Sequence, residues 1–540
     1  MSPKRKMPTK TELQQLQKLY KTDEKIGERL GGVPAYLVAY WRRKKGIPKY
    51  SLPKFSETEI RNLWERYGDD EKAGLELSLS KAAFYNWRRR YNIREKPAFL
   101  KLEQLEFNFP GAKFSSYAGS LYGKQSVAQK ILARAAGEEK VEVGRTLQVE
   151  PDIALLHKHA EEIIDAFKKS GPEYVWNPNK VLVTLDYSRC DGGGDPAEVH
   201  KLVREFVKRQ GIKNFYDLRE GTCHQVVVER GHVMPGQLIL GTDGLTTSYG
   251  CLGTMAANID AEQMLALFSN GTVDMSVPRT ICINITGRKT RGVYAKDIVL
   301  WILRQLGSGT AHDRVVEYGG SVVSQMSISE RFALSNMSVE LGARSAICPY
   351  DATTRRYLNG RAMGQYKPVV PDKDAEYENI YQVSIDQLVP QVACPGEEPS
   401  IKPAAEVEGL PVNQIVMGTC SSGRFDDLRV AADILKGKTV SSDCRMYIYP
   451  GSRAVYLEAL KKGLIRVFVE AGAMVMNPGS SPFMSSQDGL LADGERCLAT
   501  TTWQIHAPKP GKAEVYLCSP ATAAASALNG AVTDPTRFVR

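Results

Sequence analysis

The feature that most constrains the fold is a repeat near the start of the chain. Residues 11–47 align with residues 58–93 across a single gap. Matched pairs include Leu13 and Ile60, Leu16 and Leu63, Tyr20 and Tyr67, Glu24 and Glu71, Gly27 and Gly74, Trp41 and Trp87, and Arg42 and Arg88. Identities recurring at nearly one offset indicate that the chain folds the same small unit twice.

Each copy predicts three short helices. In the first copy, apolar residues at helical spacing open the unit, a second helix follows at about Asp23 to Leu30, and a third ends in the basic run WRRKK. A short turn separates the last two helices, at Gly31-Gly32 in one copy and Leu77-Ser78 in the other. This order resembles a helix-turn-helix unit, whose helix after the turn enters the DNA major groove.

The third helix of each copy carries the candidate nucleic-acid-binding residues. Its basic end is expected to bind phosphates through Arg42, Arg43, Lys44, Arg88, Arg89 and Arg90. Side chains earlier on the helix are expected to reach base edges, namely Tyr36, Ser80, Lys81 and Tyr85, while Trp41 and Trp87 pack the helix onto its unit. The alternative is a small helical domain that binds protein. Because the basic residues recur in both copies, we favour nucleic acid, and duplex DNA in particular.

Charge is divided unevenly along the chain. Residues 1–97 hold 23 Lys and Arg against 12 Asp and Glu, a net charge of +11, whereas the remainder is close to neutral at −1. A basic module attached to a neutral body favours an anionic partner such as nucleic acid.

Composition limits where the chain works. Apolar residues make up 43% of it, no run of about 18 apolar residues occurs, and no signal peptide opens the sequence. We therefore expect a cytoplasmic protein without a membrane partner. Ten cysteines are scattered singly, without CxxC pairs, which is typical of reduced thiols.

From Lys124 onward, a series of segments occurs in a characteristic order. It includes GTDGLTTSYGCLG at Gly241–Gly253, RFALSNMSVELGA, GTCSSGR around Cys420, and VYLCSPATAAASALNGAVTDP near the C-terminus. These segments resemble large subunits of the aconitase and 3-isopropylmalate dehydratase family, in which the first reads GxDSHTxxYGxxG. The resemblance covers the chain from this point to its end.

The resemblance implies an α/β fold: an aconitase-like α/β/α body of three domains around a central cleft, preceded by the small all-α module. We predict the module at 1–97 (repeats 11–50 and 57–97), a linker at 98–122, domains 1 and 2 at 123–395, and domain 3 at 396–540. Local patterns predict a strand at Lys180–Leu185, a helix at Asp260–Phe268 and a connection at Ala393–Pro411. The family's mobile swivel domain is missing, which implies a separate small subunit as a partner.

The family's chemistry uses a [4Fe–4S] cluster bound by three cysteines, whose open iron acts as a Lewis acid. Cys420 matches the first ligand and is the only retained ligand position. Ser480 and Phe483 stand at the other two, in PGSSPF. Phenylalanine has no donor atom and serine is a poor ligand for soft iron, so we predict no cluster and no other cofactor.

Other matched positions divide into lost and retained groups. By resemblance, the family's Asp-His pair is Asp186-Tyr187, its Ser-His pair is Gly244-Leu245, and two substrate-binding arginines are replaced by Trp503 and Pro508. The retained polar residues are Asp186, His224, Asp243, Asn336 and Glu340. We take His224, Asp243, Glu340 and Asp186 as candidate catalytic residues, and Asn336, Tyr187 and Trp503 as candidate pocket residues. The alternative is that the retained residues only hydrogen-bond one another.

Two cysteines and one loop are weaker candidates. Cys223 is expected in the core, because neighbouring residues on a strand, here Cys223 and His224, point to opposite faces. Cys190 is a candidate for an exposed thiol, and the DGGGD run beside it is interpreted as a plain loop because it lacks a P-loop lysine.

Two functional hypotheses follow. The first is a nucleic-acid-binding regulator whose aconitase-like body has lost the family's catalysis and binds a small molecule or partner. The alternative is a hydro-lyase or isomerase of the same lineage, with an altered substrate and a non-standard or absent metal centre. Leu245 and the aromatic replacements imply a ligand more apolar than citrate.

Overall fold

The computed structural model describes residues 7–50, 55–67, 69–77, 79–93, 124–170, 172–186, 195–396, 400–479, 491–501 and 513–539. The chain forms two compact units, divided between Leu105 and Glu106, inside the predicted linker. Among the described residues, no helix has both the length and the apolar character that a membrane span requires.

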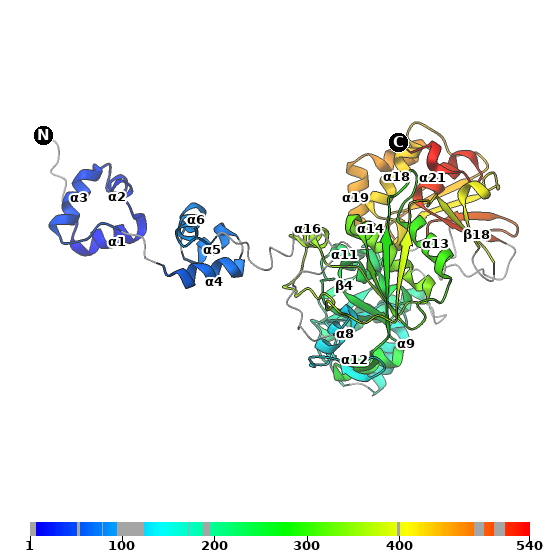
Figure 1. Cartoon of the computed structure of the whole chain (residues 1–540), viewed down its shortest axis with the longest axis horizontal. Helices are drawn as coiled ribbons and strands as arrows, with labels where there is room; N and C mark the ends of the chain where they lie inside the picture. The colour runs from blue at the N-terminus through cyan, green and yellow to red at the C-terminus, as the bar shows by residue number, and fades with distance from the viewer. Residues whose placement is uncertain are drawn as a thin grey trace. The chain divides into compact units, whose positions relative to one another are not determined.

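The N-terminal unit has the three helices predicted for each repeat (Figure 1). They are α1 (Lys10–Tyr20), α2 (Asp23–Arg29) and α3 (Ala35–Lys44), then α4 (Glu57–Tyr67), α5 (Asp70–Glu76) and α6 (Lys81–Arg90). Each repeat has a hydrophobic core of its own, in which residues from all three helices pack.

The turn between the second and third helices explains the two repeated glycines. The backbone N–H groups of Val33 and Leu79 donate to the carbonyls of Gly27 and Gly74, at 2.9 and 2.8 Å. A Cβ atom at Gly27 would lie 1.9 Å from the Val33 carbonyl oxygen, and one at Gly74 would lie 2.9 Å from that of Leu79. The close approach of the chain therefore requires glycine at both positions.

The first sheet of the larger unit has five parallel strands in the order β4-β3-β2-β5-β6. Their bounds are β2 (Ile153–Leu156), β3 (Val181–Thr184), β4 (Asn214–Tyr216), β5 (Leu238–Gly241) and β6 (Met255–Asn258). One face packs against α8 (Val127–Ala135), α9 (Ala160–Ser170), α10 (Pro196–Gln210) and α12 (Ala261–Asn270). The other packs against α11 (Cys223–Glu229) and the 3₁₀ helix η2 (Gly244–Leu252). Strand β3 and helix α12 lie where the sequence predicts them.

The second sheet has four parallel strands in the order β10-β9-β8-β11. They are β8 (Thr280–Thr286), β9 (Val315–Gly319), β10 (Ser345–Ile347) and β11 (Asn379–Ser384). Its helices are α13 (Ala295–Leu306), α14 (Ser321–Gln325), α15 (Ile328–Asn336), η3 (Met337–Leu341) and α16 (Ala352–Leu358). Strands β1 (Thr146–Val149) and β7 (Val273–Ser276) form a separate antiparallel pair.

The third sheet has seven strands in the order β13-β12-β18-β17-β14-β15-β16. They are β12 (Gln391–Cys394), β13 (Ser400–Pro403), β14 (Gln414–Gly418), β15 (Arg445–Tyr449), β16 (Met474–Val475), β17 (Arg496–Ala499) and β18 (Glu514–Cys518). The helices are α17 (Thr419–Ser422), α18 (Phe425–Leu435), α19 (Arg453–Lys461), α20 (Leu464–Glu470) and α21 (Pro520–Asn529), with short 3₁₀ turns η4 (Ala404–Glu406) and η7 (Pro535–Arg537). One hydrophobic cluster joins residues of this sheet to the second.

Two local predictions differ from the structure. The segment Ala393–Pro411 is not a plain connection: β12 pairs antiparallel with both β13 and β18, so the third sheet begins at Gln391, before the predicted boundary at 396. Cys223 and His224 lie on helix α11 instead of a strand, and both side chains are buried. The β-branched run after them favours a strand locally, but packing in the fold overrides that preference.

Candidate functional site

Three adjacent parallel strands of the first sheet end in polar side chains. His157 follows β2, Asp186 lies two residues after β3, and Asp243 lies two residues after β5. The carboxyl ends of parallel strands meet at one edge of a sheet, which is where ligands bind in open α/β folds. Sheet order thus brings together residues that are far apart in the sequence.

The first contact in this cluster joins two strands to a helix. His157 Nε2 lies 2.6 Å from Asp186 Oδ1, and Asp186 Oδ2 accepts a 2.6 Å hydrogen bond from the Cys223 backbone N–H. Cys223 is the first residue of α11, so the Asp186 carboxylate lies at the positive end of that helix. Asp186 therefore fixes both the His157 ring and the start of the helix that carries His224.

Asp243 is the centre of the cluster. Its Oδ1 lies 3.2 Å from His224 Nε2, and its Oδ2 lies 3.7 Å from His157 Nδ1 and 3.3 Å from Lys158 Nζ. The Leu245 backbone N–H also donates to Oδ1, at 2.7 Å. His157, His224 and Asp243 are each at most 4% exposed. An anionic carboxylate and several cationic or imidazole groups thus share one water-poor space.

Burial and charge have opposite effects on the pKa values here. Burial alone would lower the pKa of His224, but the Asp243 carboxylate and the Cys420 sulfur outweigh it and raise that pKa to about 10. Burial would raise the pKa of Asp243, yet His224, His157 and Lys158 together hold it well below its usual value. The Asp243 carboxyl is therefore an anion in this site.

Helix α17, which follows strand β14 of the third sheet and begins with a strained residue, brings Cys420 to the same place. Thr419, which follows β14, has φ of 62°, a left-handed conformation that a β-branched residue rarely adopts. Cys420 is buried against Leu245 and Val339. Asn336 Nδ2 donates to Ser248 Oγ at 2.9 Å and lies 4.0 Å from Cys420 Sγ. Strain of this kind concentrates at functional sites.

Two buried cations contact helix α17 and the residues around it. Lys296 Nζ donates to the carbonyls of Thr500 and Thr501, at 2.7 and 3.1 Å, and lies 3.3 Å from Ser421 Oγ. Arg424 donates to the carbonyl of Cys420 at 2.8 Å. Burial lowers the pKa of Lys296 to about 8. Lys296 and Arg424 join elements of the second and third sheets around Cys420.

The structure brings together some of the predicted residues and not others. Asp186, His224 and Asp243 meet in the cluster, and Asn336 lies beside Cys420. Glu340 is half-buried on η3, next to Val339, so its element borders the site. The other predicted positions lie outside the described residues: Tyr187, Cys190, Ser480, Phe483, Trp503 and Pro508, together with the first four residues of the DGGGD run, whose last residue, Asp195, caps α10.

Sequence reasoning missed His157, Lys158, Lys296 and Arg424. A signal existed for the first two, because they directly follow the apolar four-residue strand Ile153–Leu156. No comparable signal marks Lys296, which reads as one exposed charge on an amphipathic helix and is in fact 2% exposed.

In the described part of the chain, the possible metal-binding side chains offer nitrogen and oxygen donors. Among the described residues, the only group of three side chains placed to hold a metal ion is His157, His224 and Asp243. Cys420 lies beside this group, and the thiol of Cys223, the residue before His224, lies 3.3 Å from the Tyr249 hydroxyl. Burial raises the pKa of Cys223 well above its usual value, which keeps it a thiol. A cubane needs three thiolates, and this part of the chain does not provide them.

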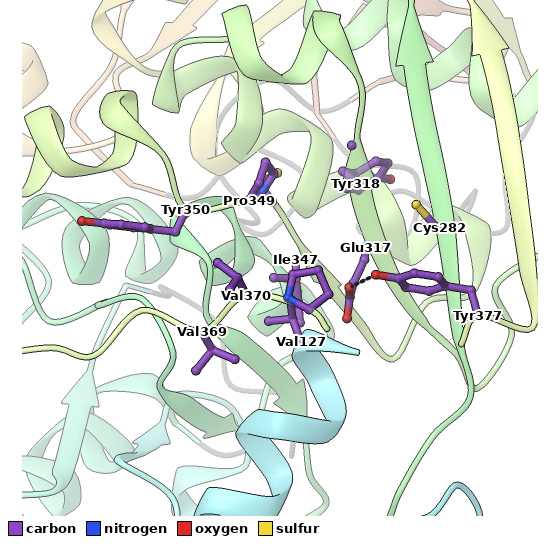
Figure 2. Close-up of a pocket in the computed structure, with 13 residues that line it drawn as sticks. Val127, Cys282, Glu317, Tyr318, Ile347, Pro349, Tyr350, Val369, Val370 and Tyr377 are labelled. Atoms are coloured by element: carbon purple, nitrogen blue, oxygen red, sulfur yellow. Dashed lines mark hydrogen bonds between the residues drawn. The ribbon is translucent and has the colours of Figure 1, made fainter. Parts of the chain in front are cut away.

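A second buried space, in the second sheet, is structural. Figure 2 shows this cavity of about 50 Å³, lined mostly by apolar residues, with Glu317 and Tyr377 facing each other. The Glu317 carboxylate accepts from the Tyr377 hydroxyl at 2.8 Å and from the Ala128 N–H at 3.0 Å. Its hydrogen bonds thus join β9 to the first turn of α8, and we assign it no ligand.

Two of the candidate nucleic-acid-binding arginines form ion pairs inside the N-terminal module. Arg42 is 6% exposed, with its guanidinium on Asp23 at 3.1 and 3.0 Å. Arg88 holds Asp70 in the same way, at 2.8 and 2.9 Å. Both guanidinium groups are thus engaged within the module, and phosphate binding by these two residues stays a prediction. The remaining basic positions, Arg43, Lys44, Arg89 and Arg90, are exposed as predicted.

Comparison with known proteins agrees with this architecture. The aconitase family model (aconitate hydratase) matches residues 193–402 and 397–530. The chain is 42% identical over 421 residues to 3-isopropylmalate dehydratase large subunit 1 of Methanopyrus kandleri, covering 77% of this chain and 100% of that protein. It is 36% identical over 419 residues to the methanogen homoaconitase large subunit of Methanocaldococcus jannaschii, covering 76% and 99%. A solved structure, the holo-form of Thermococcus kodakaraensis aconitase X, matches with a TM-score of 0.39 at 12% identity over 66% of this chain and 83% of that one, too distant to carry an argument. On the family match and these identities, the chain belongs to the aconitase family.

Proposed function

We propose that the body of this chain is a hydro-lyase that adds or removes water on a hydroxy acid, using the strand-end cluster. The observation that carries this proposal is the buried network of His157, Asp186, His224 and Asp243. It lies beside Cys420 on helix α17, whose first residue is strained. The relatives are named as dehydratase and homoaconitase large subunits, which supports an enzyme more than a regulator without catalysis.

The network suits the proton transfers that such a reaction needs. Elimination of water requires a base that takes a proton from carbon and an acid that gives one to the departing hydroxyl. His157 with Asp186, and His224 with Asp243, are two imidazole–carboxylate pairs whose rings lie 5.5 Å apart. Because the two rings are in edge-to-face contact, the two pairs can serve the two roles side by side, on a substrate bound next to them.

The substrate we propose is less anionic than citrate. Leu245, buried beside Asp243, stands where the family has histidine, and Trp503 and Pro508 stand where it has arginines. Without guanidinium groups, a second carboxylate loses its bidentate partner. A hydroxy acid with one carboxylate and an apolar substituent fits these replacements best. A separate small subunit, as expected for a large subunit, would complete the cleft.

The test is a substrate screen with the purified chain, alone and together with a swivel-domain subunit. Formation of an unsaturated acid, and exchange of the carbon-bound proton with D₂O, report the reaction. His224→Gln and Asp243→Asn should abolish both signals, whereas His232→Gln, a buried histidine of the same domain, should retain them. Absence of turnover and exchange across mono- and dicarboxylic hydroxy acids would exclude the hydro-lyase.

A second, independent function rests on the N-terminal unit. Tyr36 and Tyr85 are 74% and 46% exposed on α3 and α6, beside the exposed basic residues of the same helices. The third helix of each repeat thus carries both exposed aromatic and exposed basic side chains, which suits a nucleic-acid-binding surface. We propose that the module binds duplex DNA, and that this activity and the hydro-lyase coexist in one chain.

A further inference from the structure

We infer that His157, His224 and Asp243 form the ligand set of a single divalent transition-metal ion. The site lies within the cluster described above, so the ion's catalytic role rests on the proposed hydro-lyase. With the ion bound, the two imidazoles are ligands, and the ion with its bound water would supply the proton transfers assigned to them above. Binding of the ion can be tested separately. Nothing in the donor set resembles an iron–sulfur site. It resembles instead the set of two histidines and one carboxylate that holds mononuclear ions.

The spacing of the donor atoms fits one ion. Two ligands that each lie about 2.1 Å from a metal are roughly 3 to 3.5 Å apart in tetrahedral or octahedral geometry. Here Asp243 Oδ1 lies 3.2 Å from His224 Nε2, and Asp243 Oδ2 lies 3.7 Å from His157 Nδ1. One donor atom from each of the three residues can be chosen so that all lie within 4.8 Å of one another, and binding of one ion would draw these atoms closer together.

A second observation points to a missing ligand. His224 Nε2 is fully buried and makes no well-aligned hydrogen bond with a described residue, although an Asp243 oxygen lies 3.2 Å away and the Cys420 sulfur is also close. Buried polar atoms are nearly always satisfied, and an exception calls for an explanation. A metal ion between the imidazole and the carboxylate would give His224 Nε2 a partner.

The surroundings are those of a metal ligand. His157 has its far nitrogen, Nε2, 2.6 Å from the Asp186 carboxylate, which leaves Nδ1 toward Asp243. A carboxylate behind a histidine in this way fixes the tautomer and makes the imidazole a better ligand. Asp186 is itself held by the Cys223 N–H, so the second layer of the site is built into the fold.

The charges suggest what completes the coordination sphere. With both imidazoles neutral, as metal binding requires, Asp243 and Asp186 contribute two negative charges and Lys158 one positive charge. A divalent ion would leave a net charge of +1. A site with this balance favours an anionic fourth ligand, either hydroxide or the single carboxylate of the proposed substrate.

The experiment uses the full chain after treatment with chelator, titrated with Co²⁺ alone. We expect one equivalent to bind with visible d–d absorption and Zn²⁺ to displace it. His224→Gln and Asp243→Asn should weaken binding at least 100-fold, and Asp186→Asn should weaken it about 10- to 100-fold, as for residues behind a ligand. His232→Gln is the matched control and should bind like the natural chain.

Because a ligand variant can fail to fold, X-ray absorption on the natural Zn²⁺-loaded chain gives a second measurement. Two imidazoles and an oxygen support the site, whereas a sulfur neighbour would place the ion on Cys420 and overturn the ligand set. Unchanged Co²⁺ binding in folded His224→Gln would also overturn it. Stoichiometric binding without turnover of any hydroxy acid would leave the metal site standing and defeat only the proposed hydro-lyase.

Discussion

Arg42 binds Asp23 with both arms of its guanidinium and donates with a third N–H to the Ile47 carbonyl at 3.1 Å. The residue at the start of the second helix is thereby tied to the end of the third and to the segment that follows. Arg88 repeats the arrangement on Asp70 and the Ile93 carbonyl. These guanidinium groups stabilise the module instead of facing a partner.

We therefore predict that Arg42→Ala destabilises the first repeat by about 3 kcal/mol, because removing one partner leaves a largely buried carboxylate without its counter-charge. Hydrogen exchange of peptides from 7–50 in the full chain measures this directly. Arg43→Ala, which removes the same charge from an exposed position, is the control and should leave exchange unchanged. Equal protection of these peptides from exchange in the two variants would show that the Arg42–Asp23 ion pair does not stabilise the repeat.

The second prediction concerns nucleic acid. Replacing Arg43, Lys44, Arg89 and Arg90 with alanine should weaken duplex binding on all sequences. The slope of log affinity against log salt should fall by roughly 0.9 for each phosphate that the variant no longer neutralises. Changes at Tyr36 or Lys81 should alter sequence preference instead.

The control for this experiment is Lys168→Ala with Lys169→Ala, two exposed lysines on α9 of the body. Fluorescence titrations at several salt concentrations measure both quantities. If the natural chain shows no salt-sensitive binding to any duplex, the module is better interpreted as a protein-docking unit.

The third prediction concerns the iron–sulfur cluster. Protein purified without oxygen should contain neither stoichiometric iron with sulfide nor a broad visible band. It should dehydrate isopropylmalate and citrate far more slowly than its relatives. Two of the three thiolate positions are Ser480 and Phe483, and the matched arginine positions are Trp503 and Pro508. Chemical analysis and a coupled assay measure these properties, and brown protein or brisk turnover of either acid would contradict them.

The sequence predicts the helices of the module and the α/β character of the body, because glycine turns and hydrophobic spacing act locally. It could not reveal that His157 meets Asp243, since 86 residues separate them and only the strand order β3-β2-β5 makes them neighbours. The ion pairs of Arg42 and Arg88 had a signal in the sequence. Asp23 and Asp70 recur with Arg42 and Arg88 between the repeats, which is what an internal ion pair requires.

The last prediction concerns pH. His232 is buried, with its Nε2 2.5 Å from the Tyr216 hydroxyl. Burial, helped by nearby Arg230, lowers its pKa from 6.5 to about 4. The unfolded chain therefore binds a proton more readily than the folded chain between these values. The stability that the neutral ring allows is fully present above pH 6.5 and is lost as the pH falls toward 4, by up to about 3 kcal/mol.

His232→Gln, which cannot be protonated, should flatten this dependence of stability on pH. Urea unfolding across that pH range measures it, with exposed His159→Gln as the control. We expect the free energy of unfolding of the natural chain and of the His159 variant to fall more steeply with decreasing pH than that of the His232 variant. If all three fall with the same slope, protonation of His232 does not oppose folding.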